Sequence, residues 1–600
     1  MKILELLTPT SIFVHLFAYL SVLVSVFAVA PALAAEPEIK IEGGTKSLRE
    51  NIRQHLTLAD ESCKTPLWRL HALLGDAENE ITQAAQALGF YELEYEPKFV
   101  NDKDCWGLEL KLTPGAPVLV TELRIEINGE GRGDDIFQPL YDKPGITVGK
   151  RLNHGAYESL KTRFSTLASI HGYFDADFEH SQITVNVAEK SAVIALVYNT
   201  GPRYRIGAIN LQHDILDGKF LRRYLNISEG DYYDSDKLLD LKTLYNASNY
   251  FSLASISPET QSLKNNEVPI NINLESRKRR EYSVGAGVDT NTGPRVLLGF
   301  DDRYVNDRGH NVAADLSAGE KKTTALVAYT IPMSRPAYEF LRTYVGYEKE
   351  ITDTARIYKN TYGASYTYYQ DNKWLQTYAL DYQQENSFVG IESENKTDLV
   401  IPSVTVTRIK TDGAPYPLAG WTLMAKLSGS PESLGSDFSY LQFNARAKYI
   451  KSFSFGRILL RSEIGLTEVG EFNNLPASVR FFAGGDSSVR GYDYQSLGPL
   501  KRDVNGELVL DAAGKTIVVG GNNLLVNSIE YDYLFKDTKW AVAAFFDAGN
   551  AADDTDIEVK RGAGVGGRWI SPIGPIRLDV AKALDGDKGW RLHITMGPDL

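Results

Sequence analysis

A run of mostly small residues in the last quarter of the chain contains an arginine, Arg490, whose guanidinium is the most distinctive chemical group of the sequence. Residues 480–492 read RFFAGGDSSVRGY. Arg490 stands between a β-branched residue and a glycine, so a tight turn can present its guanidinium. The loop motif that we single out comprises Gly484, Gly485, Val489, Arg490, Gly491 and Tyr492.

The guanidinium of Arg490 requires carboxylate partners if it is shielded from water, and its planar fork forms paired, charge-assisted hydrogen bonds with them. Two downstream segments, 525–535 and 540–547, alternate aromatic or aliphatic residues with small or polar ones. Because successive side chains of a strand point to opposite faces, Glu530 and Asp547 share the polar faces of these segments. We therefore predict that Glu530 and Asp547 bind Arg490. These contacts would tether the loop to the strands and would not catalyse a reaction.

Strands must position these residues. After residue 280 the helical period disappears, and sixteen alternating segments begin near residues 282, 294, 309, 322, 338, 356, 374, 400, 418, 438, 456, 523, 538, 562, 574 and 589. Dividing 320 residues by sixteen leaves 20 per strand and connection, and a tilted membrane strand needs about 9 to 11. The pattern predicts a 16-stranded antiparallel transmembrane β-barrel over 281–600, although a half-exposed soluble sheet has the same alternation.

One connection, 468–522, is far too long for a turn, and structureless loops above about 15 residues usually have a function. If the chain enters the barrel from the periplasm, this loop follows the eleventh strand and lies outside, from where it can fold back into the lumen. Closure then pairs the first strand with the last. The glycines at this seam, Gly285, Gly287 and Gly597, weaken strand pairing. Met596 ends the last strand and is the fourth residue of the predicted seam.

The region before the barrel repeats one α+β unit three times, at a period near 80 residues. Each unit opens with an alternating strand, continues into helices that end in a small or polar residue followed by aromatics, and finishes with two strands. We predict small two-layer domains. The predicted organisation is a signal peptide 1–34, domains at 35–117, 118–200 and 201–280, and the barrel at 281–600.

The N-terminus indicates export, because Lys2 precedes an apolar stretch and an Ala-x-Ala site ends at Ala34, after which we expect cleavage. An uncleaved signal anchor is the alternative. Cys63 and Cys105 are the only cysteines. In an oxidising compartment they favour one disulfide over two free thiols.

Composition and the remaining motifs exclude several functions. The net charge of −13 argues against a nucleic-acid-binding protein, and a mean hydropathy of −0.24 argues against a bundle of membrane helices. His310 and His593, the only histidines after residue 280, have no serine or paired-carboxylate motif around them. We therefore expect no enzyme, no metal and no cofactor.

Several of these motifs together resemble a known family. The turns Gly89-Phe90-Tyr91 and Gly172-Tyr173-Phe174 resemble those of polypeptide-transport-associated (POTRA) domains, whereas the third copy, Asn249-Tyr250-Phe251, lacks the glycine. Residues 489–492 (VRGY), with FFDAG at 545–549 and GPIRLD further on, resemble the outer-membrane protein insertase superfamily. Three POTRA-like units are most similar to its translocation and assembly module branch.

This resemblance implies that Arg490 docks inward on the barrel wall and that the seam opens sideways to let a client strand pair with the first strand. It implies an outer-membrane factor, with periplasmic POTRA domains, that inserts or secretes autotransporter-like clients. The implied partners are an inner-membrane-anchored, TamB-like protein on the first POTRA domain, unfolded clients and outer-membrane lipid, but no nucleic acid. The alternative is a two-partner-secretion pore that exports one dedicated protein through the lumen.

Overall fold

The computed structural model describes residues 37–101, 105–261, 263–370, 373–390, 394–413, 416–503, 505–510, 514–572, 574–586 and 589–597. The predicted signal peptide and its cleavage after Ala34 lie outside these residues. No helix in the described ranges is both long and apolar enough to cross a membrane. The chain divides into two compact units, one ending near residue 205 and the other containing most of the third repeat and the barrel.

The first repeat forms a three-stranded sheet covered by two main helices. Their bounds are β1 (Glu38–Glu42), α2 (Lys46–His55), α3 (Leu67–Gln86), β2 (Glu94–Asn101) and β3 (Trp106–Thr113), with strand order β1-β3-β2. The Thr45 side chain caps α2 by accepting from the Leu48 N–H at 3.3 Å. Leu48 and Ile52 are fully buried, as the helical spacing predicts. Cys63 and Cys105 form the predicted disulfide.

The second repeat has the same plan. Its elements are β4 (Leu119–Asn128), α4 (Gln138–Asp142), α5 (His154–Ile170), β5 (Asp177–Asn186) and β6 (Ser191–Asn199), with strand order β4-β6-β5. The β4 strand runs parallel to β6, and β5 runs antiparallel to it. Phe164 of α5 packs on Tyr198 of β6, with ring centroids 5.1 Å apart. Gly172 ends the helix region with a φ of +84°, which glycine adopts without strain.

The third repeat contains β7 (Arg205–Gln212), α6 (Gly218–Arg222), α7 (Ser235–Ala247), β8 (Phe251–Pro258) and β9 (Glu267–Ser276), with strand order β7-β9-β8. Asn249 replaces the glycine of the other repeats and itself adopts a φ of +62°, a conformation that asparagine tolerates. Tyr250 Oη donates to the Gly309 carbonyl at 2.5 Å, and the Asp217 N–H donates to the Asp307 carbonyl at 2.9 Å. The residues directly before α6 and β8 therefore contact a turn of the barrel. One α/β sheet lies in each predicted domain, and the domain boundaries themselves remain predictions.

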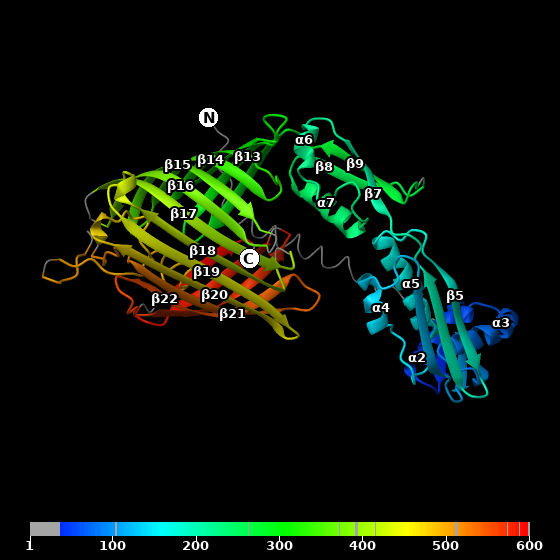
Figure 1. Cartoon of the computed structure of the whole chain (residues 1–600). Coiled ribbons are helices and arrows are strands. Elements are labelled where there is room, and N and C mark those ends of the chain that lie inside the picture. The colour runs from blue at the N-terminus through cyan, green and yellow to red at the C-terminus, as the bar shows by residue number, and fades with distance from the viewer. Residues whose placement is uncertain are drawn as a thin grey trace, which may run out of the picture. The chain divides into compact units, whose positions relative to one another are not determined.

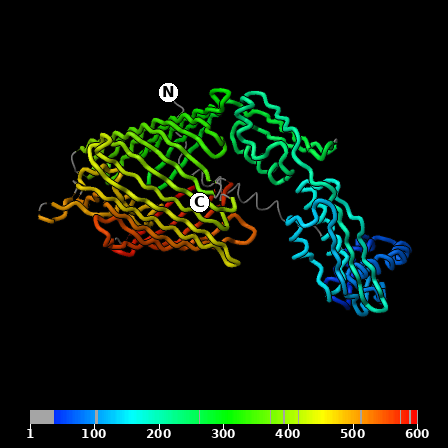
Figure 2. Tube along the Cα trace, in the orientation of Figure 1, coloured from blue at the N-terminus to red at the C-terminus, as the bar shows by residue number. Residues whose placement is uncertain are grey.

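The barrel contains sixteen antiparallel strands joined in chain order (Figures 1 and 2). Their bounds are β10 (Arg280–Asp289), β11 (Gly293–Asp302), β12 (Asn311–Gly319), β13 (Lys322–Pro332), β14 (Glu339–Ile351), β15 (Ala355–Tyr369), β16 (Leu375–Val389), β17 (Asn395–Thr411), β18 (Ala419–Ser430), β19 (Tyr440–Phe453), β20 (Gly456–Val469), β21 (Asn523–Leu534), β22 (Trp540–Ala552), β23 (Lys560–Ser571), β24 (Gly574–Ala583) and β25 (Trp590–Met596). The predicted fold class and strand number are confirmed, and every start lies within five residues of its predicted position.

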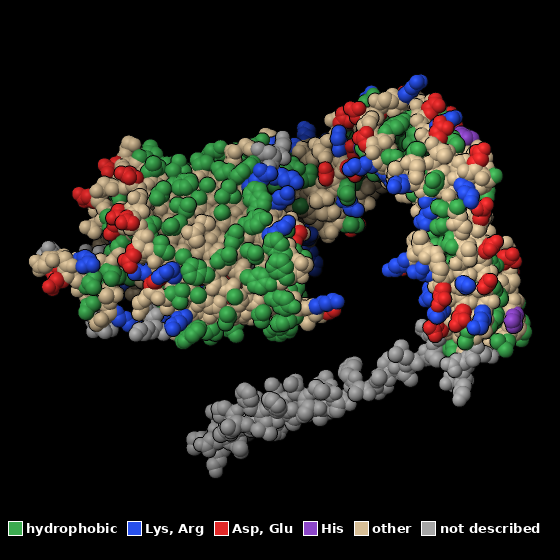
Figure 3. Space-filling model, turned by 90° about the horizontal axis from the view of Figure 1, so that it is seen from below, with side chains coloured by type: hydrophobic (Ala, Val, Ile, Leu, Met, Phe, Trp, Pro, Cys, Tyr) green, Lys and Arg blue, Asp and Glu red, His purple; other side chains and the backbone are tan. Residues whose placement is uncertain are grey.

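The two faces of the barrel wall differ as the alternation predicts. On β22, Trp540, Val542 and Phe546 are exposed, whereas Phe545 and Asp547 are buried. Figure 3 shows hydrophobic side chains gathered over the outer wall. The outer face is therefore suited to lipid and the inner face to polar contacts.

The seam differs from the expectation. Within the described strands, hydrogen-bonded neighbours run from β10 to β25, and no ladder joins β25 back to β10. The Ile594 N–H instead donates to Thr290 Oγ1 at 3.2 Å. The predicted ladder closure is thus wrong for this structure. A physical reason is that β25 has only seven residues against ten in β10, and its end is followed by Gly597 with a φ of +145°.

Candidate functional site

The connection between β20 and β21 folds against the inner face of the barrel through residues 475–497. Phe481 and Gly521 exchange backbone hydrogen bonds of 2.9 and 2.8 Å, and these bonds hold the two ends of the loop together. Arg480, which is buried, donates through Nε to the Leu475 carbonyl at 2.8 Å. The described part of the loop is therefore held together by hydrogen bonds of its own.

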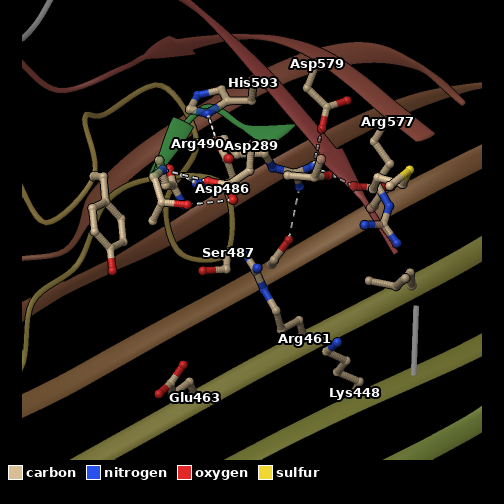
Figure 4. A pocket seen from close by; sticks show the side chains of 18 of the residues that line it. Asp289, Lys448, Arg461, Glu463, Asp486, Ser487, Arg490, Arg577, Asp579 and His593 are labelled. Carbon is tan, nitrogen blue, oxygen red and sulfur yellow. Dashed lines mark hydrogen bonds and ion pairs between the residues drawn. The ribbon is translucent and has the colours of Figure 1, made fainter. Parts of the chain in front are cut away.

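Arg490 lies at the centre of an ionic cluster inside the barrel (Figure 4). Its Nε and Nη2 donate to the two oxygens of Asp547 at 2.8 and 3.0 Å. Its Nη1 donates to Glu530 at 2.7 Å and to Asp579 at 3.0 Å. The guanidinium thus binds three carboxylates, and β21, β22 and β24 carry one each. Only 5% of Arg490 is exposed.

Asp547 accepts hydrogen bonds from other groups besides the Arg490 side chain. The backbone N–H of Arg490 donates to it at 3.0 Å, and Ser528 Oγ donates at 2.6 Å. The guanidinium carbon of Arg490 also lies 3.4 Å from the centroid of the Phe545 ring, which is a cation–π contact. The position of the loop backbone is therefore fixed together with that of its arginine.

A second buried arginine completes the cluster. Arg568 of β23 donates to Glu530 at 2.8 Å and to Asp579 at 2.5 Å. Two guanidiniums therefore share three buried carboxylates, and every strand from β21 to β24 contributes at least one charged group. Buried charges are stable only when they are paired and hydrogen-bonded, so the members of this cluster depend on one another.

A row of glycines on β23 makes room for the loop. A Cβ at Gly562 would lie 1.9 Å from the Arg490 carbonyl oxygen, and one at Gly566 would lie 1.9 Å from the Asp579 carboxylate. Gly491 of the loop has a φ of +98°, and its Cβ would lie 2.7 Å from the backbone of Ala583. Gly562 and Gly491 are required because the loop and the wall approach backbone to backbone there, whereas Gly566 leaves room for the Asp579 side chain of the neighbouring strand.

The other residues of the motif pack around this contact. Val489 is fully buried in an apolar cluster with Tyr492, and the Tyr492 hydroxyl donates to the Asp585 carbonyl at 2.9 Å. Gly484 and Gly485 have φ values near +100°, and a Cβ at Gly484 would lie 2.3 Å from the Asp493 carbonyl oxygen. All six predicted motif residues therefore lie at or beside the docking contact.

The structure brings Glu530 and Asp547 to Arg490, and their functional role remains a proposal. Sequence reasoning missed Asp579 and Arg568 as members of the cluster. Strand alternation could have indicated Asp579, because its neighbours Leu578 and Val580 are the outward-facing residues of β24. The remaining predicted residues, Gly285, Gly287, Met596 and Gly597, lie on or beside the seam strands outside the ionic cluster.

A lumenal cavity of about 590 Å³ borders the cluster. Arg490, Asp579 and Met596 line it, together with Asp486 and His593. His593 is paired with Asp486, a residue more than a hundred positions earlier. The sequence around His593 indicates no carboxylate partner, because the partner comes from the folded-back loop.

Residues 298–599 match the Omp85 superfamily domain. The chain belongs to the Omp85 superfamily. Residues 38–114 match the first POTRA domain of TamA, and residues 204–277 match a POTRA family described as a surface antigen variable number repeat. The barrel of this chain therefore lies in the outer membrane, and its POTRA domains lie in the periplasm.

The chain is similar to the outer membrane protein assembly factor BamA of two organisms. It is 22% identical over 390 residues to that of Nitratidesulfovibrio vulgaris, covering 62% of this chain and 47% of the relative. It is 23% identical over 492 residues to that of Neisseria meningitidis, covering 68% and 58%. The chain spans about half the length of these curated relatives.

Among solved structures, BamA from Haemophilus ducreyi lacking POTRA domains 1–3 superposes with a TM-score of 0.63 at 18% identity. The match covers 80% of this chain and 99% of that structure. At this identity the similarity establishes the fold alone.

Proposed function

We propose that this protein is a non-enzymatic outer-membrane assembly factor, which helps client proteins, such as autotransporter-like barrels, to insert through the seam between β10 and β25. The observation that carries the proposal is the edge of β10. Within the described strands no ladder covers this edge. The names of the similar proteins, outer membrane protein assembly factors, support the same class of function.

The edge of β10 is suited to bind an extended client segment. Tyr282 is 71% exposed and Val284 is 82% exposed, so the N-terminal part of the strand is the less covered part. A strand edge without a neighbour offers N–H and C=O groups that a second chain can pair with. In a membrane such groups must be satisfied, so a client strand that pairs there is stabilised as it enters the bilayer.

The ionic cluster supports this proposal by its position. Arg490 connects the loop to β21, β22 and β24, and β24 lies immediately before β25 in the sheet. A wall braced in this way resists deformation. We infer that movement is therefore concentrated at the seam, where the ladder is missing.

The POTRA domains are proposed to receive the clients and a TamB-like inner-membrane-anchored partner. In the first domain, β3 is the central strand, and β1 and β2 are both edges of the sheet. Either edge can accept a strand from a partner. Since the proposed function includes no enzymatic step, the driving force is the folding of the client and its burial in outer-membrane lipid.

The proposal is tested by locking the seam. Cysteines replace Gly287 and Met596 in the full chain, which is reconstituted in lipid vesicles, and the assembly of a client barrel is followed with the crosslink formed and then reduced. We expect assembly to stop when the crosslink forms and to recover on reduction. A matched control crosslinks Val345 of β14 to Tyr362 of β15, a pair inside a continuous ladder. Full activity of the locked seam would contradict the proposal.

A further inference from the structure

We propose that Asp486 and His593 form a clasp that joins the two seam strands through the loop and thereby controls whether the seam opens. The inference rests on the proposed function, because it concerns the regulation of the same seam. Asp486 lies in the loop four residues before Arg490, and His593 lies on β25.

The loop is bound to the end of β10. Thr290, directly after this strand, donates its hydroxyl to the two carboxylate oxygens of Asp486 at 2.9 and 2.8 Å. The backbone N–H of Asp486 donates to Asn291 Oδ1 at 3.2 Å. A Cβ at Gly485 would lie 2.8 Å from the same Asn291 oxygen. The glycine therefore lets the loop approach the first strand this closely.

The loop is also bound to β25. Nδ1 of His593 is hydrogen-bonded to the Asp486 carboxylate, and Nε2 of His593 accepts from the Gly491 N–H at 3.0 Å. A ring nitrogen that accepts a hydrogen bond carries no proton, so the proton of the neutral imidazole is assigned to Nδ1, facing the carboxylate. Only 5% of His593 is exposed. The imidazole is thus held between two parts of the loop.

The side chain of Asp486, which is 4% exposed, takes one donor from each side of the seam. Separating the strands would remove either Thr290 or His593 from it. A buried carboxylate that loses a hydrogen-bond donor is strongly destabilised. Because the Thr290 hydroxyl also accepts from the Ile594 N–H, one hydroxyl links the loop and both strands. The seam therefore cannot part at this end while the clasp is intact.

Asp486 and Arg490 have different tasks in this arrangement. Arg490 binds carboxylates on β21, β22 and β24, and none of its described hydrogen bonds reaches β10. Asp486 extends the loop to the seam itself. Release at Asp486 can therefore free the seam while the loop remains docked through Arg490.

The test measures the width of the seam in the full chain in lipid nanodiscs. Spin labels are placed at Leu298 of β11 and Leu578 of β24, outward-facing residues on the strands that flank β10 and β25. The native cysteines are joined in a disulfide and do not react with the label. Pulsed dipolar spectroscopy then gives the distribution of distances across the seam.

We expect Thr290→Val and Asp486→Ala each to raise the ratio of long to short distances by about tenfold or more, as loss of a buried charge-assisted hydrogen bond predicts. The matched control is Thr292→Val, because the Thr292 hydroxyl donates to Asp289 in the same turn and has no described contact with the loop. It should leave the distribution unchanged. Heat-modifiable electrophoretic mobility verifies that each barrel is folded. A wild-type distribution in folded Thr290→Val and Asp486→Ala would overturn the clasp.

Client assembly by the same variants separates this inference from the proposed function. If the labels separate and assembly changes, both stand. If the labels separate while assembly is unchanged in rate and yield, the clasp stands and insertion through the seam is contradicted. If the labels do not separate, the clasp is overturned whatever the assembly assay shows.

Discussion

Replacing Arg490 by alanine is the sharpest perturbation of the docked loop. The side chain donates to Asp547, Glu530 and Asp579, and it also contacts Ser528 at 3.4 Å. Without it, Arg568 still pairs with Glu530 and Asp579, while Asp547 loses the guanidinium that donates to both of its oxygens. Alanine therefore removes the group on which the charge balance of the site depends.

The size of the effect follows from this imbalance. Removing one partner of a buried ion pair destabilises a structure by about 3 to 5 kcal/mol, because the other charge stays buried without compensation. Here the penalty falls on loop docking, since the barrel ladders do not involve Arg490. A loss of about 3 kcal/mol raises the undocked population by more than about a hundredfold.

Hydrogen exchange of the backbone amides measures this population directly. The N–H of Arg490 is bonded to Asp547, and that of Gly491 is bonded to His593, so both are protected only while the loop is docked. In Arg490→Ala we expect exchange in residues 484–492 to accelerate more than about a hundredfold. Arg502→Ala, an exposed arginine of the same loop, is the control. Unchanged exchange in the alanine variant of Arg490 would refute the tether.

Three further predictions concern other parts of the chain. Gly562→Ala should undock the loop as Arg490→Ala does, because its Cβ would lie 1.9 Å from a loop carbonyl oxygen. Gly567→Ala on the same strand is the control, since its Cβ would meet no atom within 4 Å. Hydrogen exchange of the loop amides in the two variants checks this. Reducing Cys63–Cys105, which are 42 residues apart, should destabilise the first POTRA domain by about 4 kcal/mol, and unaltered protease resistance of this domain would speak against it. Burial lowers the pKa of His154, so the folded state favours the neutral ring. The stability of the folded chain should therefore fall as the pH drops below about 6.5 and through the pKa of folded His154. An NMR titration midpoint of His154 at or above about 6.5 would contradict this.

The barrel is predictable from the sequence because strand alternation is a local signal. The polar face of 525–535 and the aromatic residues opposite it are enough to place Glu530 on the inner face. The long connection 468–522 is an equally clear signal, since it cannot be a turn. The same local reasoning identifies the helices of the first two repeats through their buried apolar faces.

Contacts between distant segments are not predictable in this way. Arg568 joins the cluster only because β23 lies between β22 and β24 in the sheet. His593 meets Asp486 only after the loop has folded back into the lumen. Ladder closure at the seam fails as a prediction because it treats the barrel as regular, whereas β25 is short and is followed by a glycine.

Site-specific photo-crosslinking from the edge of β10 tests the central claim, that clients enter through the seam, most directly. A photoreactive residue replaces Tyr282 on β10, Tyr362 on β15 or the lumen-facing Arg446 on β19, and crosslinks are collected while a client barrel assembles. The account predicts client adducts from position 282 and none from positions 362 or 446. Adducts from position 446 without any from 282 would contradict it and would favour export through the lumen.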